Sequence, residues 1–148
     1  MNKEIYKFMC LNGVTSISFS FLGMALQWLY GTTTDDDGRE TNNFILFGDL
    51  LASMAFTATE GKGFRRPLML SAGQAQYSED MLARNWHLGR KRVRNLLERM
   101  EAIGLIEIFP SRVASVMTFP CVDGWNTEEN GFVRNPAYSK QREENGDG

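Results

Sequence analysis

The sequence predicts a mainly helical protein with one small β-hairpin, an α+β fold in which helices dominate. Three observations predict it. Apolar residues in the first third of the chain recur at helical spacing. Two short helical segments with a tight connection occupy residues 79–103, and after Gly104 the apolar period becomes that of a strand. The 148 residues are enough for one domain with its own core.

The first part of the chain is expected to hold two helices and a polar loop. From Ile17 to Gly31 the apolar side chains fall on one helical stripe. Residues 32–43 contain no apolar side chain, which indicates a solvated loop. Residues 44–56 form the second expected helix, whose inner face holds Leu46, Leu50, Leu51, Met54 and Ala55.

The middle of the chain carries clear start and stop signals. Residues 60–63 indicate a flexible basic connector, and the apolar run 68–70 indicates a brief strand. Ser78 is a typical N-cap, because its hydroxyl oxygen can accept from the first-turn amides of a helix. Glu79 and Asp80 then favour the positive end of the helix dipole. We therefore expect a third helix from Glu79 to Trp86.

A three-residue connection, 87–89, leads directly into a fourth helix that starts at Arg90 and ends before Gly104. Its inner face holds Val93, Leu96, Leu97, Met100 and Ile103. Residues 105–109 and 113–119 are β-branched and aromatic runs, so they predict a hairpin.

These elements divide the chain into regions. We expect a single domain over residues 1–125, with its core in 44–125 and an N-terminal helical extension in 1–43. From Asn126 the apolar residues become sparse, so residues 126–148 are expected to be a polar flexible tail or linker.

The charge of the chain is unevenly distributed. Residues 62–94 carry eight basic and two acidic side chains, a net charge of +6, whereas the whole chain carries −2. Such a basic segment in an otherwise acidic protein is typical of polyanion binding. A solvated helix face would produce the same pattern.

Composition argues against catalysis and against a membrane. The sequence contains no P-loop, dinucleotide fingerprint or nucleophile elbow, and His87 is its single histidine. Asp35 and Asp37 have the first spacing of a calcium loop, but Glu40 stands where glycine is needed. We expect no enzymatic activity, no cofactor, no metal ion and no membrane association. The cysteines, Cys10 and Cys121, lack a partner motif, which points to free thiols in the cytoplasm.

One ordering of short motifs runs through residues 73–106. In chain order, the motifs are Gly73-Gln74, Ser78, Leu82-Ala83, Val93 to Leu97, and Gly104 to Ile106. This order resembles the winged-helix DNA-binding domains of bacterial primosomal proteins and phage replisome organisers, over about residues 44–125. The resemblance implies a winged helix-turn-helix preceded by two N-terminal helices.

The resemblance also implies a function. The resemblance implies a noncatalytic protein that binds double-stranded DNA and acts as a replication initiator or replisome organiser of a phage or mobile element. The implied partner is a replicative helicase or another replisome protein. A winged-helix transcriptional regulator is one alternative. The other is a protein–protein interaction module without DNA binding, in which the first helix forms the face of a homodimer.

The expected DNA contacts lie on and around the fourth helix. With the inner face buried, a helical wheel turns Lys91, Arg94 and Asn95 outward, where they can bind guanine and adenine edges in the major groove. Arg90 and Arg92 flank this face and are expected to contact phosphates. The full set of expected DNA-binding residues is Ser78, Arg84, Arg90, Lys91, Arg92, Arg94, Asn95 and Arg112.

Three of these expectations are less direct. Ser78 can meet a phosphate or act only as an N-cap, and Arg112 stands at the tip of the hairpin, where a wing contacts DNA. Lys62, Arg65 and Arg66 can add contacts with the DNA backbone.

His87 occupies a turn position that requires a left-handed backbone. The whole assignment requires that Lys91, Arg94 and Asn95 point outward and are not paired with the chain's own carboxylates.

Overall fold

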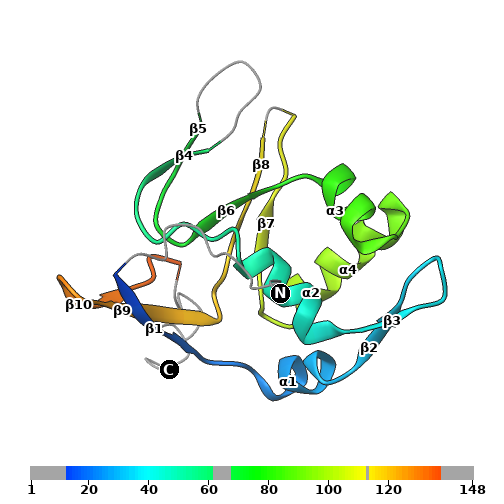
Figure 1. The fold of residues 1–148 in the computed structure, drawn as a ribbon, viewed down its shortest axis with the longest axis horizontal. Helices are drawn as coiled ribbons and strands as arrows, with labels where there is room; N and C mark the ends of the chain where they lie inside the picture. Colours follow the sequence, from blue (N-terminus) through cyan, green and yellow to red (C-terminus); the bar gives the residue numbers. More distant parts are fainter. Residues whose placement is uncertain (1–12, 62–67, 113, 138–148) are drawn as a thin grey trace, which may run out of the picture.

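The computed structural model describes residues 13–61, 68–112 and 114–137. Within this part of the chain it has four helices and ten strands (Figure 1). The helices are α1 (Gly23–Leu29), α2 (Asn43–Leu51), α3 (Glu79–Trp86) and α4 (Arg90–Ala102). The strands are β1 (Val14–Phe19), β2 (Thr32–Thr34), β3 (Glu40–Asn42), β4 (Thr59–Gly61), β5 (Leu68–Leu70), β6 (Gln74–Tyr77), β7 (Glu107–Phe109), β8 (Ser115–Thr118), β9 (Val122–Thr127) and β10 (Gly131–Arg134). The expectations for Cys10, Lys62, Arg65, Arg66 and residues 138–148 lie outside the described residues.

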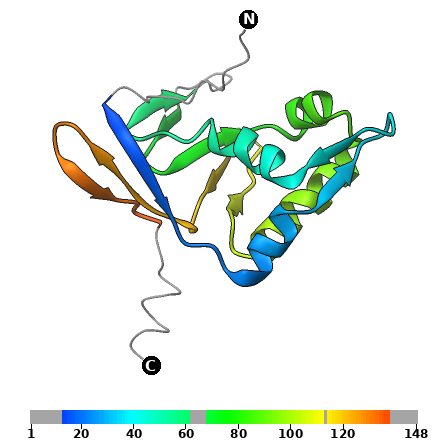
Figure 2. The ribbon, with the colours of Figure 1, turned by 60° about the horizontal axis from the view of Figure 1, so that its bottom comes forward.

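The expectation of a mainly helical protein is wrong. Helices and strands hold about equal numbers of the described residues, so the protein is α+β without a helical majority. The strands pair in antiparallel sheets of order β1-β9-β10, β2-β3, β4-β5 and β6-β8-β7. The β1-β9-β10 sheet and the pair α3–α4 lie at opposite ends of the molecule (Figures 1 and 2).

The first expected helix is only half correct. A helix is present, but it begins at Gly23, and the residues from Val14 to Phe19 form β1 instead. The segment Val-Thr-Ser-Ile-Ser-Phe contains three β-branched residues, and its last three residues alternate apolar and polar side chains, so it suits a strand. Its partner is β9, near the other end of the chain, where Trp125 lies opposite Ile17.

The expected solvated loop at residues 32–43 is wrong, because this segment is the β2–β3 hairpin. The Asp35 carboxylate shapes its tip by accepting from the backbone amides of Arg39 and Asp37, both at 2.9 Å. These bonds, the Arg39 amide first, hold the pKa of Asp35 below its usual range. Gly38 supplies the positive φ, +86°, that completes the turn. Figure 2 shows the hairpin alongside α4.

The tail expected from Asn126 is also wrong as far as residue 137. Asn126 lies inside β9, and β10 follows it in the same sheet. Asn135, just after β10, is 1% exposed and donates from Nδ2 to the carbonyls of Phe119 at 3.0 Å and Val122 at 2.9 Å. The polar side chains of this segment therefore lie on the exposed face and at the edge of a sheet, and their abundance does not mark a flexible tail.

The central segments agree better with the sequence. Helix α3, the strand Leu68–Leu70 and the β7–β8 hairpin are confirmed, and α4 is closed by Gly104 with φ +86°. Helix α2 ends at Leu51 and not at residue 56, although its expected inner face is buried. Strand β6 was not expected; it pairs with β8 and buries Ala75 in the core.

The buried amide of Asn135 gives a test of the C-terminal sheet. Asn135→Ala removes two donors from buried carbonyls, so we expect the free energy of unfolding to fall by about 2 kcal/mol. Urea denaturation measures this difference. Asn130→Ala is the matched control, because Asn130 is exposed in the turn before β10, and it should change the stability little. Equal stabilities for the two variants would contradict the role given to Asn135.

Candidate nucleic-acid interface

The turn between α3 and α4 sets the angle at which α4 projects. Ser78 caps α3, since its Oγ accepts from the Met81 amide at 3.3 Å. At the other end His87 adopts the left-handed conformation, with φ 56° and ψ 47°. Its conformation reverses the chain so that Leu88 donates its amide to the Ala83 carbonyl at 3.0 Å and buries its side chain. The expectation of a left-handed residue at His87 is confirmed.

Buried contacts lock both helices onto the core. Trp86, at the end of α3, is 6% exposed and donates from Nε1 to Asp49 Oδ2 on α2 at 2.9 Å. On α4, Val93, Leu97 and Met100 are at most 1% exposed. Trp86 is therefore a packing residue, and the side of α4 away from these three residues faces solvent.

The solvent face of α4 consists of Lys91, Asn95 and Glu98, all exposed. We call these three residues the outer face. Arg90 and Arg94 border it on the side of α3, and Arg92 borders it on the side of the β2–β3 hairpin. The outward orientation expected for Lys91, Arg94 and Asn95 is thus present, because each of these side chains is exposed.

Two arginines of α4 are held by carboxylates of α3. Arg94 donates from Nη2 to Glu79 Oε1 at 2.9 Å and from Nε to Glu79 Oε2 at 3.3 Å. Arg90 lies 3.4 Å from Glu79 Oε1 and 3.2 Å from Asp80 Oδ1. The bond from Arg94 lowers the pKa of Glu79, and the same bond raises the pKa of Arg94. Arg94 is exposed but paired with one of the chain's own carboxylates, so the expectation that it is unpaired is wrong. Lys91 and Asn95 form no ion pair among the described residues.

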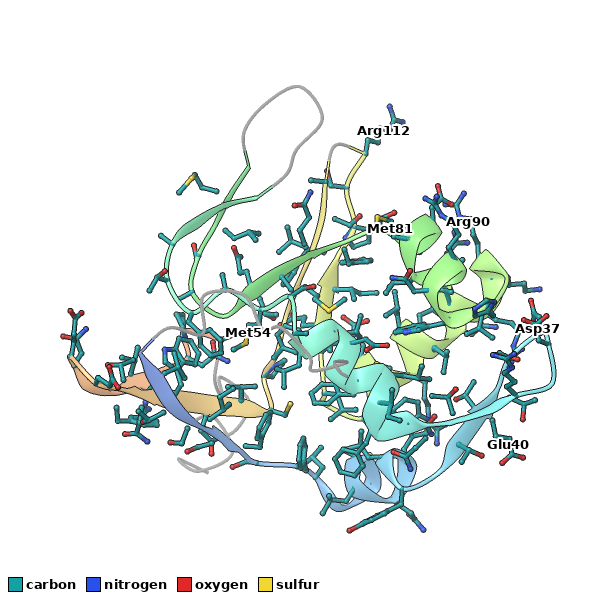
Figure 3. The ribbon with its side chains drawn as sticks, viewed as in Figure 1. Asp37, Glu40, Met54, Met81, Arg90 and Arg112 are labelled. Atoms are coloured by element: carbon teal, nitrogen blue, oxygen red, sulfur yellow. The ribbon has the colours of Figure 1, made fainter. Side chains whose placement is uncertain are left out.

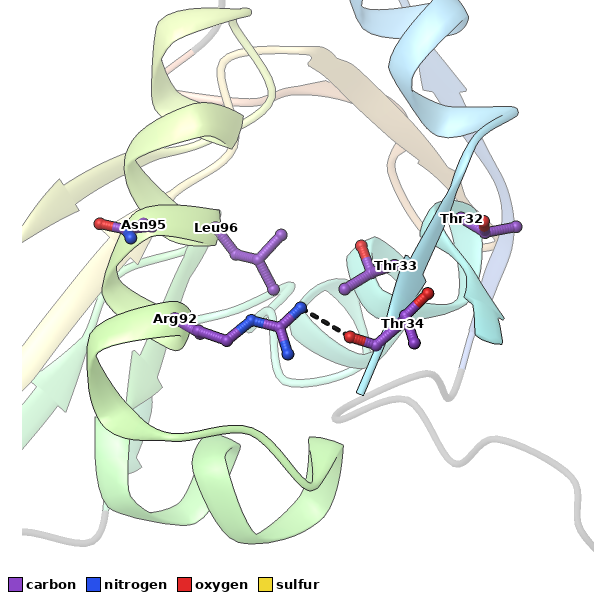
Figure 4. A pocket seen from close by; sticks show the side chains of 6 residues that line it. All are labelled: Thr32, Thr33, Thr34, Arg92, Asn95 and Leu96. Atoms are coloured by element: carbon purple, nitrogen blue, oxygen red, sulfur yellow. Dashed lines mark hydrogen bonds between the residues drawn. The ribbon is translucent and has the colours of Figure 1, made fainter. Parts of the chain in front are cut away.

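Arg92 is held from the opposite side (Figure 4). It donates from Nη1 to Asp36 Oδ1 at 3.0 Å and from Nη2 to the Thr34 carbonyl at 2.6 Å. The arginine crosses a shallow hollow of about 430 Å³ between α4 and β2. Threonines 32–34, Asn95 and Leu96 complete the lining of this hollow.

A larger groove, about 1140 Å³ in volume, separates α3 and α4 from the β7–β8 hairpin. Arg90 and Arg112 stand near its two sides, with Met81 between them (Figure 3). Five of the eight expected DNA-binding residues line it, namely Ser78, Arg84, Arg90, Arg94 and Arg112. Four arginines and the four carboxylates Asp49, Glu79, Asp80 and Glu98 line the groove together, so its lining carries no net charge.

The cations of the expected site therefore fall into two groups. Among the described residues, no ion pair holds Lys91, Arg84 or Arg112, and all three are exposed. Arg90, Arg92 and Arg94 are paired, but their side chains remain 46–59% exposed. Exposed ion pairs contribute only about 0–1 kcal/mol, so a phosphate can replace the carboxylate partners of these arginines at low cost.

Sequence reasoning missed the carboxylates that hold the arginines. Glu79 was read only as a helix-start residue, and Asp36 only as part of a loop. Asp36 is 56 positions from Arg92 in the sequence, and no local pattern connects them. Two signals for the hairpin that brings them together were present in the sequence, namely the β-branched run Thr32–Thr34 and the turn dipeptide Asp37-Gly38.

A second surface is apolar. Six large side chains on α1, beside it and at the start of α2 are exposed, namely Leu22, Met24, Leu26, Tyr30, Phe44 and Ile45. We call this the α1 surface. The rings of Tyr30 and Phe44 meet edge to face at 5.8 Å, so the surface is continuous between the two helices.

No protein-family model, curated protein or solved structure matches this chain.

Among the described residues, no helix has both the length and the apolar composition that a bilayer crossing needs. In the same part of the chain, no three side chains of His, Cys, Asp or Glu come together as metal ligands. Cys121 is buried, and desolvation raises the pKa of its thiol to about 12.

The Glu79 ion pairs predict a pH dependence of stability. Because the pKa of Glu79 is lower in the folded chain than its ordinary value of 4.5, its contribution is complete above that value and is lost as the pH falls through the folded pKa. At about pH 7, Glu79→Gln should lower the unfolding free energy by about 1 kcal/mol. The difference should shrink as the pH falls below 4.5 and should vanish below the folded pKa of Glu79.

Urea denaturation across this pH range measures the effect. Asp80→Asn is the matched control, since Asp80 stands in the same helical turn but is 63% exposed, and among the described residues its only ion pair is with Arg90. Its effect should be smaller at every pH. A Glu79→Gln deficit that persists unchanged at low pH would contradict the role of the charged carboxylate.

Proposed function

We propose that this protein is a noncatalytic protein that binds duplex DNA with α3, α4 and the β7–β8 hairpin. One observation carries the proposal: a rigidly held helix presents Lys91 and Asn95 to solvent, with exposed arginines on both sides. An α-helix fits the major groove of B-DNA, where lysine can bind guanine O6 and N7 and asparagine can bind adenine N6 and N7. The helix-turn-helix and hairpin order described above supports the same reading.

The surroundings of α4 supply phosphate contacts in this arrangement. Arg84 projects from α3, the helix that crosses the DNA backbone in helix-turn-helix proteins. Arg112, at the tip of the β7–β8 hairpin, also lines the groove that separates α3 and α4 from this hairpin. Glu98 on the outer face repels phosphate and can accept from cytosine N4, which favours a reader of sequence over a nonspecific binder.

The ion pairs limit how strongly the protein binds. Three cations of the expected site, Lys91, Arg84 and Arg112, need no exchange of partner among the described residues. The three paired arginines must first leave a carboxylate. We therefore expect moderate affinity, with a salt dependence set by about three cations, namely Lys91 in the major groove and Arg84 and Arg112 on phosphates.

A role in replication is the narrower part of the proposal, and it rests on the residue order of 73–106 alone. A replication initiator or replisome organiser of a phage or mobile element would recruit a replicative helicase to its DNA site. A transcriptional regulator would contact RNA polymerase. Copurification of one or the other with the DNA-bound protein distinguishes the two roles.

The outer face gives the direct test. Lys91→Ala combined with Asn95→Ala removes both base contacts, so we expect affinity for the bound duplex to fall by about tenfold or more. Thermal stability should not change, because neither side chain is buried. The matched control is Arg99→Ala, an exposed cation further along α4, which should weaken binding less than about threefold.

Fluorescence anisotropy against a footprinted duplex measures both effects, and a salt titration supplies a second readout. The logarithm of the affinity should fall with the logarithm of salt concentration with a slope of about −3, because about three cations displace counterions from the DNA. Tight duplex binding by the double variant would rule out α4 as the reading helix.

One observation favours a second function, self-association. The α1 surface is apolar, and residues 8–34 contain no acidic, basic or histidine side chain. Because this surface carries no charged side chains, it offers no electrostatic complementarity to a charged partner. Two copies of the surface can pack together without charge repulsion. We propose a second copy of this chain as its partner. Aromatic side chains such as Tyr30, which is 75% exposed, are enriched in such interfaces.

Sedimentation velocity tests self-association. The wild-type protein should sediment as a dimer at micromolar concentration, and Met24→Lys with Tyr30→Glu should sediment as a monomer, because both changes place charges in the interface. The control is Met69→Lys, since Met69 is 61% exposed on β5, outside the α1 surface. A monomeric wild type would remove this second function.

A further inference from the structure

The tip of the β2–β3 hairpin is docked on the helix-turn-helix. The backbone amide of Asp36 donates to the His87 carbonyl at 2.9 Å, and Asp37 Oδ2 lies 3.3 Å from His87 Nδ1. The Asp36 side chain then reaches Arg92 on the first turn of α4 at 3.0 Å. The hairpin thus places a carboxylate at the edge of the outer face.

The position of this carboxylate is built by the hairpin itself. The Asp35 side chain ties the turn together through two backbone amides, and Asp35 also donates its own amide to the Arg39 carbonyl at 2.8 Å. The amide of the next residue, Asp36, anchors the tip to the helix-turn-helix. Asp36 is therefore held against Arg92 by a folded turn and does not reach it from a flexible loop.

The contact is nevertheless reversible. The side chains of Arg92 and Asp36 are 46% and 53% exposed, and exposed ion pairs are weak. The hollow beside Arg92 gives the guanidinium room to move away from Thr34. An arginine fork binds carboxylate and phosphate with the same geometry, so a DNA phosphate can replace Asp36.

We infer that Asp36 competes with DNA phosphate for Arg92 and thereby lowers the sequence-independent affinity of the protein. This inference rests on the proposed DNA-binding function. Of the three expected base-reading residues, Arg94 is paired with Glu79, whereas Lys91 and Asn95 have no such competitor among the described residues. Asp36 therefore weakens phosphate binding without weakening base contacts. That makes it a specificity-determining residue, since nonspecific affinity arises from phosphate contacts.

The test measures binding to a short mixed-sequence duplex by fluorescence anisotropy over a range of salt concentrations. Asp36→Asn frees Arg92, so we expect about three- to fivefold tighter binding at low salt and a salt slope that changes from about −3 to about −4. The matched control is Glu40→Gln, which removes the same charge from the same hairpin. Glu40 is exposed and forms no ion pair among the described residues, so its effect should stay below about twofold.

A double-mutant cycle identifies Arg92 as the target of the competition. In an Arg92→Ala background, Asp36→Asn should increase affinity no more than Glu40→Gln does. Equal gains for the two hairpin variants in the wild-type background would overturn the inference and leave only a general charge effect, with the DNA-binding proposal intact. Absence of duplex binding by the wild type and every variant would overturn the DNA-binding proposal, and this inference with it.

Discussion

The candidate site depends on one backbone constraint, the left-handed conformation of His87. This conformation turns the chain between α3 and α4, so that the side chain of Leu88 enters the core and Val93 packs the inner face of α4 against the core. The hydrogen bond from Trp86 to Asp49 then fixes the end of α3 on α2. Because all of these contacts are buried, α4 has a single orientation, and its solvent face is decided before any ligand is present.

Electrostatics on this rigid helix are balanced. The first turns of α4 concentrate basic residues, but carboxylates from α3 and from the β2–β3 hairpin hold three of its arginines. A single helix with unpaired arginines would bind any polyanion. In the proposed DNA complex, each paired arginine would bind a phosphate only by exchanging one exposed partner for another. Phosphate contacts would then be conditional, whereas Lys91 and Asn95 are exposed and have no ion-pair partner among the described residues.

The sequence predicted that the side chains of Lys91 and Asn95 point outward, but it did not predict the ion-pair partners of the arginines. Helical spacing correctly turned Lys91 and Asn95 outward, and the N-cap at Ser78 and the turn at His87 were readable from short-range rules. The pairing of Arg94 with Glu79 depends on the crossing angle of two helices. The pairing of Arg92 with Asp36 depends on a hairpin far away in the sequence.

The local elements α3, α4 and the β7–β8 hairpin were determined by the sequence alone, because caps, turn residues and periodicity act within a few positions. Tertiary structure decided the rest. Two segments become strands only because they find partners far away in the sequence. Val14–Phe19 pairs as β1 with β9, and the polar stretch beyond Asn126 supplies the end of β9 and its other partner, β10. Residues 32–43 likewise form a hairpin that binds α4. A strand is stabilised by its neighbours, and a single sequence does not name them.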